Sequence, residues 1–287
     1  MSSATLRLDG AVAGVPFLAL PPPTPIDHAP LVVVWHLAGS PRSERAMAAA
    51  LPLQGLPAWR LYLGLPMLGS RLPEGGLDEF FRRFREDPVL NVFDPITRAG
   101  VEEFPDALAE VRRRLPLGNG PLGLVGGSLG AWVALGVLTE TELPVSTVAL
   151  VSPAIRAASV VAHYERLWGT EYGWTAKARG AAERLDFVAR ADEITERDTA
   201  TLLVVGATDD QQGFRQPADE LRRTLAQRAP SRTALVRIPA MEHALADEPG
   251  LEPAPQTAHA AQVDAALVDW FRQSASRQRA LSKQARP

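Results

Sequence analysis

The chain has 287 residues, of which 46% are hydrophobic, and its formal net charge at pH 7 is −3. That hydrophobic share is typical of a globular protein and excludes a largely disordered chain. The 30 basic and 33 acidic side chains nearly balance, so the composition gives no electrostatic reason to expect nucleic acid as a partner. Cysteine is absent, which excludes disulfide bonds, thiolate metal ligands and a cysteine nucleophile.

Two features of the sequence bear on membranes. The first residues, MSSATLRLDGAVAG, lack the basic segment and apolar run of a secretory signal, so we expect a cytoplasmic protein. Residues 115–139 contain no charged side chain and are long enough to cross a bilayer. Their many glycines and Pro121 favour a buried strand, a glycine turn and a buried helix over a spanning helix. We therefore expect no membrane partner.

Short apolar runs of the kind that form strands alternate with helical patterns, which predicts an α/β fold with a mostly parallel sheet and helices on its faces. The first two runs flank Asp9-Gly10 and are expected to form an antiparallel pair. The runs at 31–35 and 59–63 are typical of strands buried on both faces. The predicted strands are 5–8, 15–20, 31–35, 59–63, 122–125, 145–151, 201–205 and 233–238.

Apolar residues at helical spacing predict helices between these strands. The helix that begins at Leu129 is apolar nearly all round, which predicts that it is central and buried. The predicted helices lie near 77–84, 101–115, 129–138, 217–228 and 263–271.

Two long excursions leave this alternating pattern. Residues 65–98 form one, which is longer than a usual strand-to-helix connection. Residues 153–199 form the other, which we interpret as an inserted lid. No linker separates two cores, so residues 1–274 are expected to form a single domain. The polar, basic residues 275–287 are expected to form a flexible tail.

Residues 126–130 read Gly-x-Ser-x-Gly and lie between a predicted strand and a predicted helix. A serine at such a tight turn has a strained backbone, and its hydroxyl projects above the sheet near a helix N-terminus. This context makes Ser128 the candidate nucleophile and the amide of Leu129 a candidate oxyanion donor. The structural alternative is that Ser128 only caps the helix. A Walker A phosphate-binding loop is excluded because no lysine lies near the glycines. A dinucleotide-binding fingerprint is excluded because it belongs to the first strand-to-helix turn, whereas this turn lies mid-chain.

A serine hydroxyl needs a general base, which is most often a histidine. His243 lies in the loop after the last predicted strand and before the last helix, from which an imidazole can reach back to Ser128. The other histidines are less suited: His28 lies in a proline-rich loop, His163 in the lid segment and His259 at the start of the last helix. The remaining one, at position 36, ends an early strand and belongs to the loop considered below.

The imidazole in turn needs a carboxylate that fixes its tautomer. Asp209 and Asp210 follow the predicted strand 201–205, and we favour Asp209 while keeping Asp210 open. The alternative acid position, after the strand ending at 151, holds Ser152 and Pro153 and no carboxylate.

A second oxyanion donor is expected from the loop after the strand 31–35, which reads His-Leu-Ala-Gly-Ser. Its small residues allow the backbone to approach a substrate. The amide of Ala38 is the first candidate and that of Leu37 the second. A plain strand-to-helix turn is the structural alternative.

These features together resemble the α/β-hydrolase superfamily, over most of the chain. The resemblance rests on Gly-x-Ser-x-Gly around Ser128, then Asp209, then His243, in the order that the superfamily uses. His36 is similar to the histidine of its His-Gly oxyanion segment, but Leu37 stands where glycine is usual. The resemblance implies an eight-stranded, mostly parallel sheet with a lid after the sixth strand. Among its branches the chain looks most similar to bacterial serine esterases and to prolyl-oligopeptidase-like hydrolases without a propeller.

The implied function is cleavage of an ester, thioester or amide bond of a small, apolar or aryl substrate through an acyl-enzyme. No metal and no cofactor is needed, and we expect a monomer or a homodimer. Leu37 and the lid aromatics Trp168, Tyr172 and Trp174 are expected to bind substrate, with lid packing as the alternative role of the aromatics. Two other functions stay open: acyl transfer or cyclisation by the same triad in a biosynthetic pathway, and a non-catalytic binding module.

Overall fold

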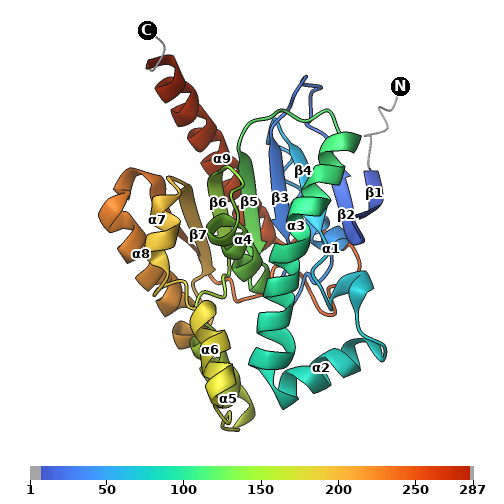
Figure 1. The fold of residues 1–287 in the computed structure, drawn as a ribbon, viewed down its shortest axis with the longest axis vertical. Coiled ribbons are helices and arrows are strands. Elements are labelled where there is room, and N and C mark those ends of the chain that lie inside the picture. The colour runs from blue at the N-terminus through green and yellow to red at the C-terminus, as the bar shows by residue number, and fades with distance from the viewer. Residues whose placement is uncertain (1–7, 285–287) are drawn as a thin grey trace.

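The computed structural model describes residues 8–284 and, in the last helix, side chains up to residue 277. Its centre is an eight-stranded sheet in the order β1-β2-β4-β3-β5-β6-β7-β8 (Figure 1). Strands β1 and β2 run antiparallel to their neighbours, and β3 to β8 are parallel, which confirms the predicted mostly parallel sheet. The strands are β1 Leu8–Val12, β2 Val15–Leu20, β3 Leu31–Trp35, β4 Trp59–Leu63, β5 Leu122–Gly127, β6 Val145–Val151, β7 Ala200–Gly206 and β8 Thr233–Ile238.

The opening hairpin differs in its turn from the prediction. Asp9 and Gly10 lie within β1, and the turn is formed by Ala13 and Gly14. Both turn residues have positive φ angles, 47° and 79°, which suits the tight turn of a two-residue hairpin. The predicted strand at 5–8 lies outside the described residues except for Leu8.

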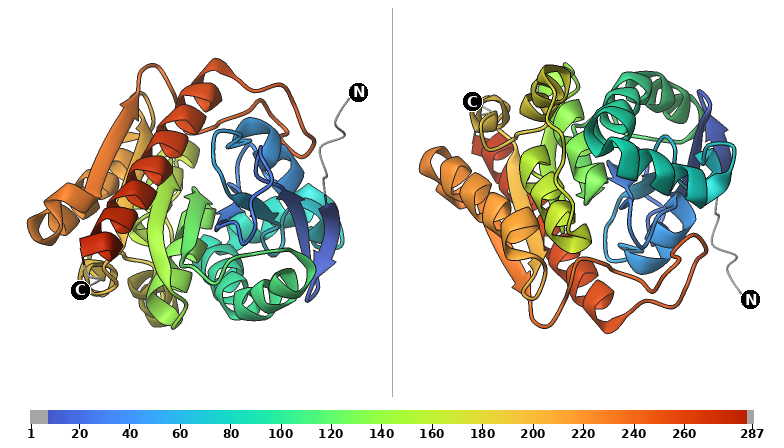
Figure 2. Two further views of the ribbon diagram at one scale, coloured as in Figure 1. Left: turned by 90° about the horizontal axis from the view of Figure 1, so that it is seen from above. Right: turned by 90° about the horizontal axis from the view of Figure 1, so that it is seen from below.

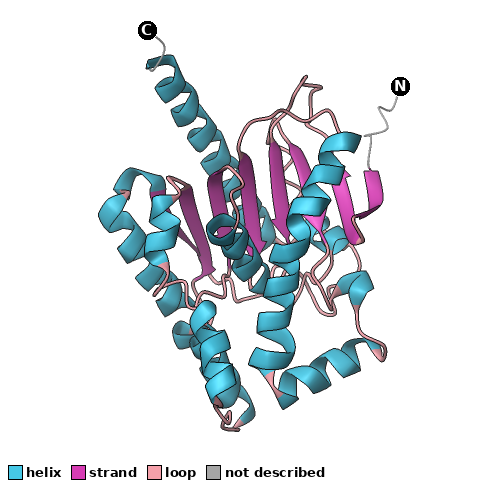
Figure 3. Cartoon of the chain, viewed as in Figure 1, coloured by secondary structure: helices cyan, strands magenta, loops and turns pink. Residues whose placement is uncertain are grey.

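Helices cover both faces of the sheet (Figures 2 and 3). Helices α1 and α9 pack on one face, and α3, α4, α7 and α8 pack on the other. The helices are α1 Glu44–Ala50, α2 Gly76–Glu86, α3 Asp94–Arg114, α4 Leu129–Glu140, α5 Ala157–Trp168, α6 Ala176–Arg184, α7 Ala191–Glu196, α8 Gln216–Arg228 and α9 Ala258–Gln284.

The core is divided by the sheet into two hydrophobic clusters. Along β3, Leu31, Val33 and Trp35 join one cluster. Val32 and Val34 join the other. Because successive side chains of a strand point to opposite faces, this central strand must be apolar throughout. The order of the strands places the carboxyl ends of β3, β5, β7 and β8 along one edge of the sheet.

The two excursions pack against each other beyond that edge (Figure 1). In the first, α2 is followed by a π-helical turn, Val89–Phe93, that leads directly into α3, so this helix begins at Asp94 rather than near residue 101. In the second, α5 and α6 extend beyond the sheet, whereas α7 packs against α4 and α8 beside it. The Arg184 side chain binds the carboxylate of Asp94 at 2.8 Å and so joins the two segments.

The end of the chain also differs from the prediction. Helix α9 continues from the predicted segment 263–271 as far as Gln284, so residues 275–284 extend this helix where a flexible tail was expected. Apolar residues at helical spacing mark the part of a helix that packs against other elements. The polar residues after 274 carry no such spacing, so the sequence did not predict this extension. Within residues 8–284 we find no helix with the length and apolar character needed to cross a membrane.

Candidate active site

Ser128 lies at the sharp turn between β5 and α4. Its φ and ψ angles are 45° and −113°, a conformation that is strained for a residue with a side chain. The turn closes because its flanking residues are glycines. A Cβ atom on Gly126 would lie 2.4 Å from the carbonyl oxygen of Gly130, and one on Gly130 would lie 2.5 Å from that of His36. The sequence therefore holds Ser128 at the crest of the central strand, as its motif predicted.

His243 comes from the loop that follows β8. Its Nε2 atom is 2.8 Å from Ser128 Oγ, and its Nδ1 atom is 2.9 Å from Asp209 Oδ2. The loop is held behind the strand ends by Thr208, whose amide and hydroxyl both donate to the Met241 carbonyl at 3.0 and 2.8 Å. The three side chains thus form one hydrogen-bonded chain, although they lie 34 and 115 residues apart in the sequence.

The two neighbouring aspartates have different environments. The Asp209 side chain is only 3% exposed, and its second oxygen accepts the amide of Asp210 at 2.7 Å. Asp210 points away from His243: it caps the next helical turn by accepting the Gly213 amide at 2.6 Å and binds Arg166 at 2.8 Å. Of the two candidates left open by the sequence, Asp209 is therefore the one that contacts the imidazole.

The candidate oxyanion donors face the same cavity as Ser128. Within residues 8–284, the amides of Ala38 and Leu129 have no hydrogen-bond acceptor, and both residues line the cavity beside the serine. The amide of Leu37 already donates to the Pro41 carbonyl at 3.1 Å, which removes it as a donor. This geometry favours the pair Ala38 and Leu129.

His36 fixes the conformation of the loop at residues 36–40, named the oxyanion loop because it carries the candidate donor Ala38. It is fully buried, and its Nε2 atom accepts the amide of Leu65 at 3.0 Å. Its Nδ1 atom must therefore carry the proton, which it donates to the Leu37 carbonyl at 2.6 Å. Burial lowers the pKa of His36 from 6.5 to about 4, because the charged imidazolium is disfavoured away from water.

This lowered pKa predicts a specific loss of stability in acid. The unfolded chain takes up a proton at His36 below about pH 6.5, whereas the folded chain does not until about pH 4, so falling pH favours the unfolded state. Between pH 7 and pH 5, this difference costs about 2 kcal/mol. Urea unfolding should therefore show a pH dependence that is smaller by this amount in His36→Gln than in the wild type. Equal slopes in the wild type and in His36→Gln would refute the assignment.

Hydrogen bonds join the oxyanion loop to the loop that carries His243. Ser40 donates through Oγ to the Asp247 carbonyl at 2.7 Å, and its own carbonyl accepts the amide of Leu245 at 3.0 Å. The amide of Arg42 donates to the Gly250 carbonyl at 2.8 Å. Since both loops carry candidate site groups, these bonds fix the amide donors relative to the imidazole.

The hydroxyl of Ser128 opens into a cavity of about 280 Å³ with aromatic walls. Both excursions contribute to it, and their rings pack edge-on: Phe84 of α2 lies 4.7 Å from Tyr164 of α5, measured between ring centroids. The aromatic residues that line the cavity are Phe80, Phe81, Phe84, Phe93, Trp132, Tyr164, Trp168 and Phe214.

Only one of the four residues expected to bind substrate lines this cavity. Trp168 does so, from the end of α5. Leu37 is fully buried and packs against Gly127 in the core. Tyr172 donates its hydroxyl to Asp87 at 2.6 Å and so ties the two excursions together, while its ring packs on Trp174, 4.8 Å away. Leu37, Tyr172 and Trp174 thus lie outside the cavity of Ser128, which corrects the position expected for them.

Sequence reasoning missed several residues of the cavity. Arg42 and Glu248 line it at the junction of the two loops just described, and Phe93 and Phe214 line it from helical turns. The Phe214 ring also packs against the His243 ring at a tilt of 42°, with centroids 4.0 Å apart. None of the four belongs to a recognisable motif, so only the folded arrangement of loops reveals them.

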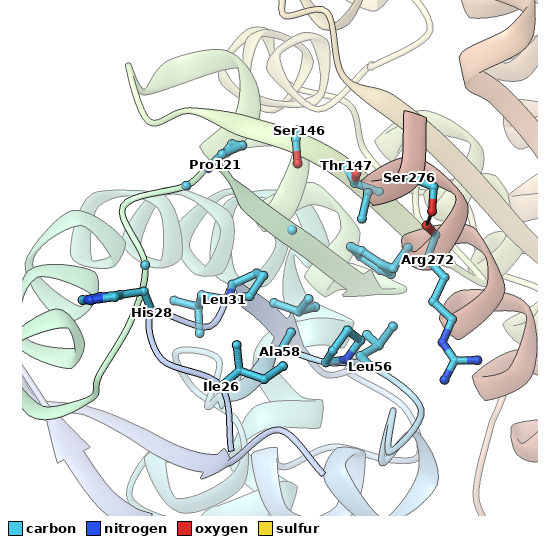
Figure 4. A pocket seen from close by; sticks show the side chains of 18 residues that line it. Ile26, His28, Leu31, Leu56, Ala58, Pro121, Ser146, Thr147, Arg272 and Ser276 are labelled. Atoms are coloured by element: carbon cyan, nitrogen blue, oxygen red, sulfur yellow. Dashed lines mark hydrogen bonds between the residues drawn. The ribbon is translucent and has the colours of Figure 1, made fainter. Parts of the chain in front are cut away.

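A larger cavity of about 610 Å³ lies away from this site (Figure 4). It is lined by residues at the start of β3 and β6, such as Leu31 and Thr147, and by Phe271 and Arg272 of α9. Ser128, His243 and Asp209 do not line it. In open α/β sheets the reactive site lies at the carboxyl ends of the strands, so the smaller cavity is the candidate active site.

Comparison with known proteins identifies the fold. With the sequence alone, no family model and no curated protein matches. Among solved structures, TT1662 from Thermus thermophilus is 19% identical with a TM-score of 0.60, over 93% of this chain and 98% of that one. Carboxyl esterase 2 from the fungus Tuber melanosporum is 19% identical with a TM-score of 0.59, over 96% and 89%. A puromycin-hydrolyzing peptidase from Mycobacterium tuberculosis is 16% identical with a TM-score of 0.62, over 94% of this chain but 39% of the peptidase.

These likenesses confirm the fold that the motifs predicted. The chain has the α/β-hydrolase fold, with an eight-stranded, mostly parallel sheet and helices on both faces. It corresponds to about two fifths of the mycobacterial peptidase and to nearly the whole of the two shorter proteins.

Proposed function

We propose that the chain is a serine hydrolase that cleaves an ester, thioester or amide bond of a small, apolar or aryl substrate. One observation carries this proposal: the continuous hydrogen-bonded chain from Ser128 through His243 to the buried Asp209. A chain of nucleophile, base and orienting carboxylate is the arrangement that activates a serine hydroxyl. The likeness of the fold to an esterase and to a peptidase adds support.

In the proposed reaction, the Ser128 hydroxyl transfers its proton to His243 Nε2 as Oγ bonds to the substrate carbonyl carbon. The carbonyl oxygen becomes an oxyanion that accepts hydrogen bonds from the amides of Leu129 and Ala38, each worth roughly 3 kcal/mol in such sites. The intermediate collapses when His243 protonates the leaving group. Water then loses a proton to His243, attacks the acyl-enzyme and releases the acid and free Ser128.

The aromatic walls of the cavity support an apolar or aryl acyl group as the substrate part held near Ser128. The cavity of about 280 Å³ is slightly smaller than the usual range for ligand sites, roughly 300–1,000 Å³. Short and aryl acyl groups fit such a space better than long chains do.

A fluorophosphonate probe and a panel of 4-nitrophenyl esters test this proposal. We expect a covalent adduct on Ser128 and faster hydrolysis of acetyl, butyryl and phenylacetyl esters than of the lauroyl ester. Analysis of the products formed with an added alcohol distinguishes hydrolysis from acyl transfer, because a transferase forms the new ester as its main product. Absence of both adduct and turnover would indicate a non-catalytic protein.

A further inference from the structure

Among the residues that the structure describes, Arg42 is the one permanently charged cation that lines the cavity of Ser128. It follows the oxyanion loop, and its side chain is 5% exposed. A guanidinium has five N–H donors, and burying them without acceptors is unfavourable. Among the residues that the structure describes, its only hydrogen-bonded side-chain partner is Glu248, through Nη2, and its Nε has none. The protein itself therefore leaves the hydrogen-bonding capacity of this buried guanidinium partly unused.

The partner of Arg42 is a weak competitor for this position. The Glu248 side chain is 64% exposed, so its carboxylate is in large part hydrated already. An ion pair with one exposed member adds little stability, and Glu248 loses little when it turns out to water. A second carboxylate that enters the cavity can then take its place on the guanidinium, which binds planar anions in a two-pronged manner.

A second polar residue, Tyr164, belongs to the wall of the same cavity. Its hydroxyl has no hydrogen-bond partner within residues 8–284. Burial and then the nearby charge of Asp209 raise the pKa of Tyr164 to about 12, so the hydroxyl stays protonated and available as a donor at neutral pH. The other wall beside Arg42 is the ring of Phe81, whose centroid lies 5.8 Å from the guanidinium carbon.

We propose that Arg42 and Tyr164 form an anion-binding subsite within the cavity, and that the substrate carries a carboxylate which replaces Glu248 on Arg42. The inference rests on the proposed function and narrows its substrate class to esters or amides that combine an apolar or aryl part with a carboxylate. When substrate is absent, the Glu248 carboxylate binds the guanidinium of Arg42 in its place.

The test compares two esters that differ mainly in one charge, 4-nitrophenyl hydrogen glutarate and 4-nitrophenyl pentanoate. The measured quantity is the ratio of kcat/KM for the charged ester to that for the neutral ester. Loss of the charged hydrogen bonds in Arg42→Met should lower this ratio about tenfold to a hundredfold, mainly through KM. Tyr164→Phe should lower it by a smaller factor. Glu248→Gln should raise it severalfold, because the competing carboxylate is removed.

The opposite signs of the Arg42 and Glu248 variants separate this subsite from a structural ion pair. If the pair only holds the loops, both variants slow the two esters equally and the ratio stays that of the wild type, which overturns the subsite. Glu248 is largely exposed, so Glu248→Gln keeps the test decisive even if Arg42→Met fails to fold. Hydrolysis of the neutral ester with an unchanged ratio defeats the subsite alone, whereas hydrolysis of neither ester defeats the proposed function as well.

Discussion

Replacing Ser128 by alanine is expected to lower kcat by roughly 10⁴- to 10⁶-fold on every ester that the wild type cleaves. The variant lacks the oxygen that would form the proposed acyl-enzyme, while the amides of Leu129 and Ala38 and the imidazole of His243 stay in place. Steady-state hydrolysis of a 4-nitrophenyl ester measures the loss, and mass spectrometry of the protein after fluorophosphonate treatment should show no adduct. Thermal unfolding should be close to that of the wild type.

Ser152 provides a matched control for this experiment. It follows β6, the strand next to β5, and it also has a positive φ angle, 41°. It is fully buried, and its hydroxyl has no hydrogen-bond partner in the part of the chain that the structure describes. Ser152→Ala should therefore keep kcat within a small factor of the wild type and should still be labelled. Loss of labelling in Ser152→Ala with retention in Ser128→Ala would reverse the assignment of the nucleophile.

Local sequence signals predicted the parts of the molecule that local geometry determines. The turn at Ser128 needs glycines on both sides because the helix and the oxyanion loop approach it within contact distance, so its motif is readable in five letters. Apolar runs such as 31–35 are readable because a strand buried on both faces is built mainly from apolar side chains. The order of the strands then brings the loop of His243 to the same edge of the sheet.

Other features depend on contacts that a single sequence does not display. The turn of the first hairpin was assigned to Asp9-Gly10 by its local preference, but pairing of Val12 with Val15 places it at Ala13 and Gly14. Tyr172 was expected in the substrate cavity because it is aromatic, yet its position relative to α2 directs its hydroxyl to Asp87. Arg42 belongs to no motif, and only the packing of the oxyanion loop on the loop of Glu248 places it beside Ser128.

The choice between Asp209 and Asp210 is an instance of the same limit. A shift of one residue redirects a side chain, and both positions follow the same strand end. What distinguishes them is the helical turn that begins next: Asp210 is used to cap it, which leaves Asp209 to turn back toward His243.

Asp209→Asn is expected to lower kcat about 10⁴-fold while leaving the fold intact. The amide side chain would present an N–H to His243 Nδ1, so the imidazole would carry its proton on Nε2 and could not accept the proton of Ser128. Asp210→Asn is the matched control, because it makes the same chemical change one residue away. It weakens the contact with Arg166 and the cap on the next turn, so we expect a small loss of stability and at most a severalfold change in kcat. Equal losses of kcat in the two variants, measured on the same ester at the same pH, would show that Asp209 has no special role behind His243.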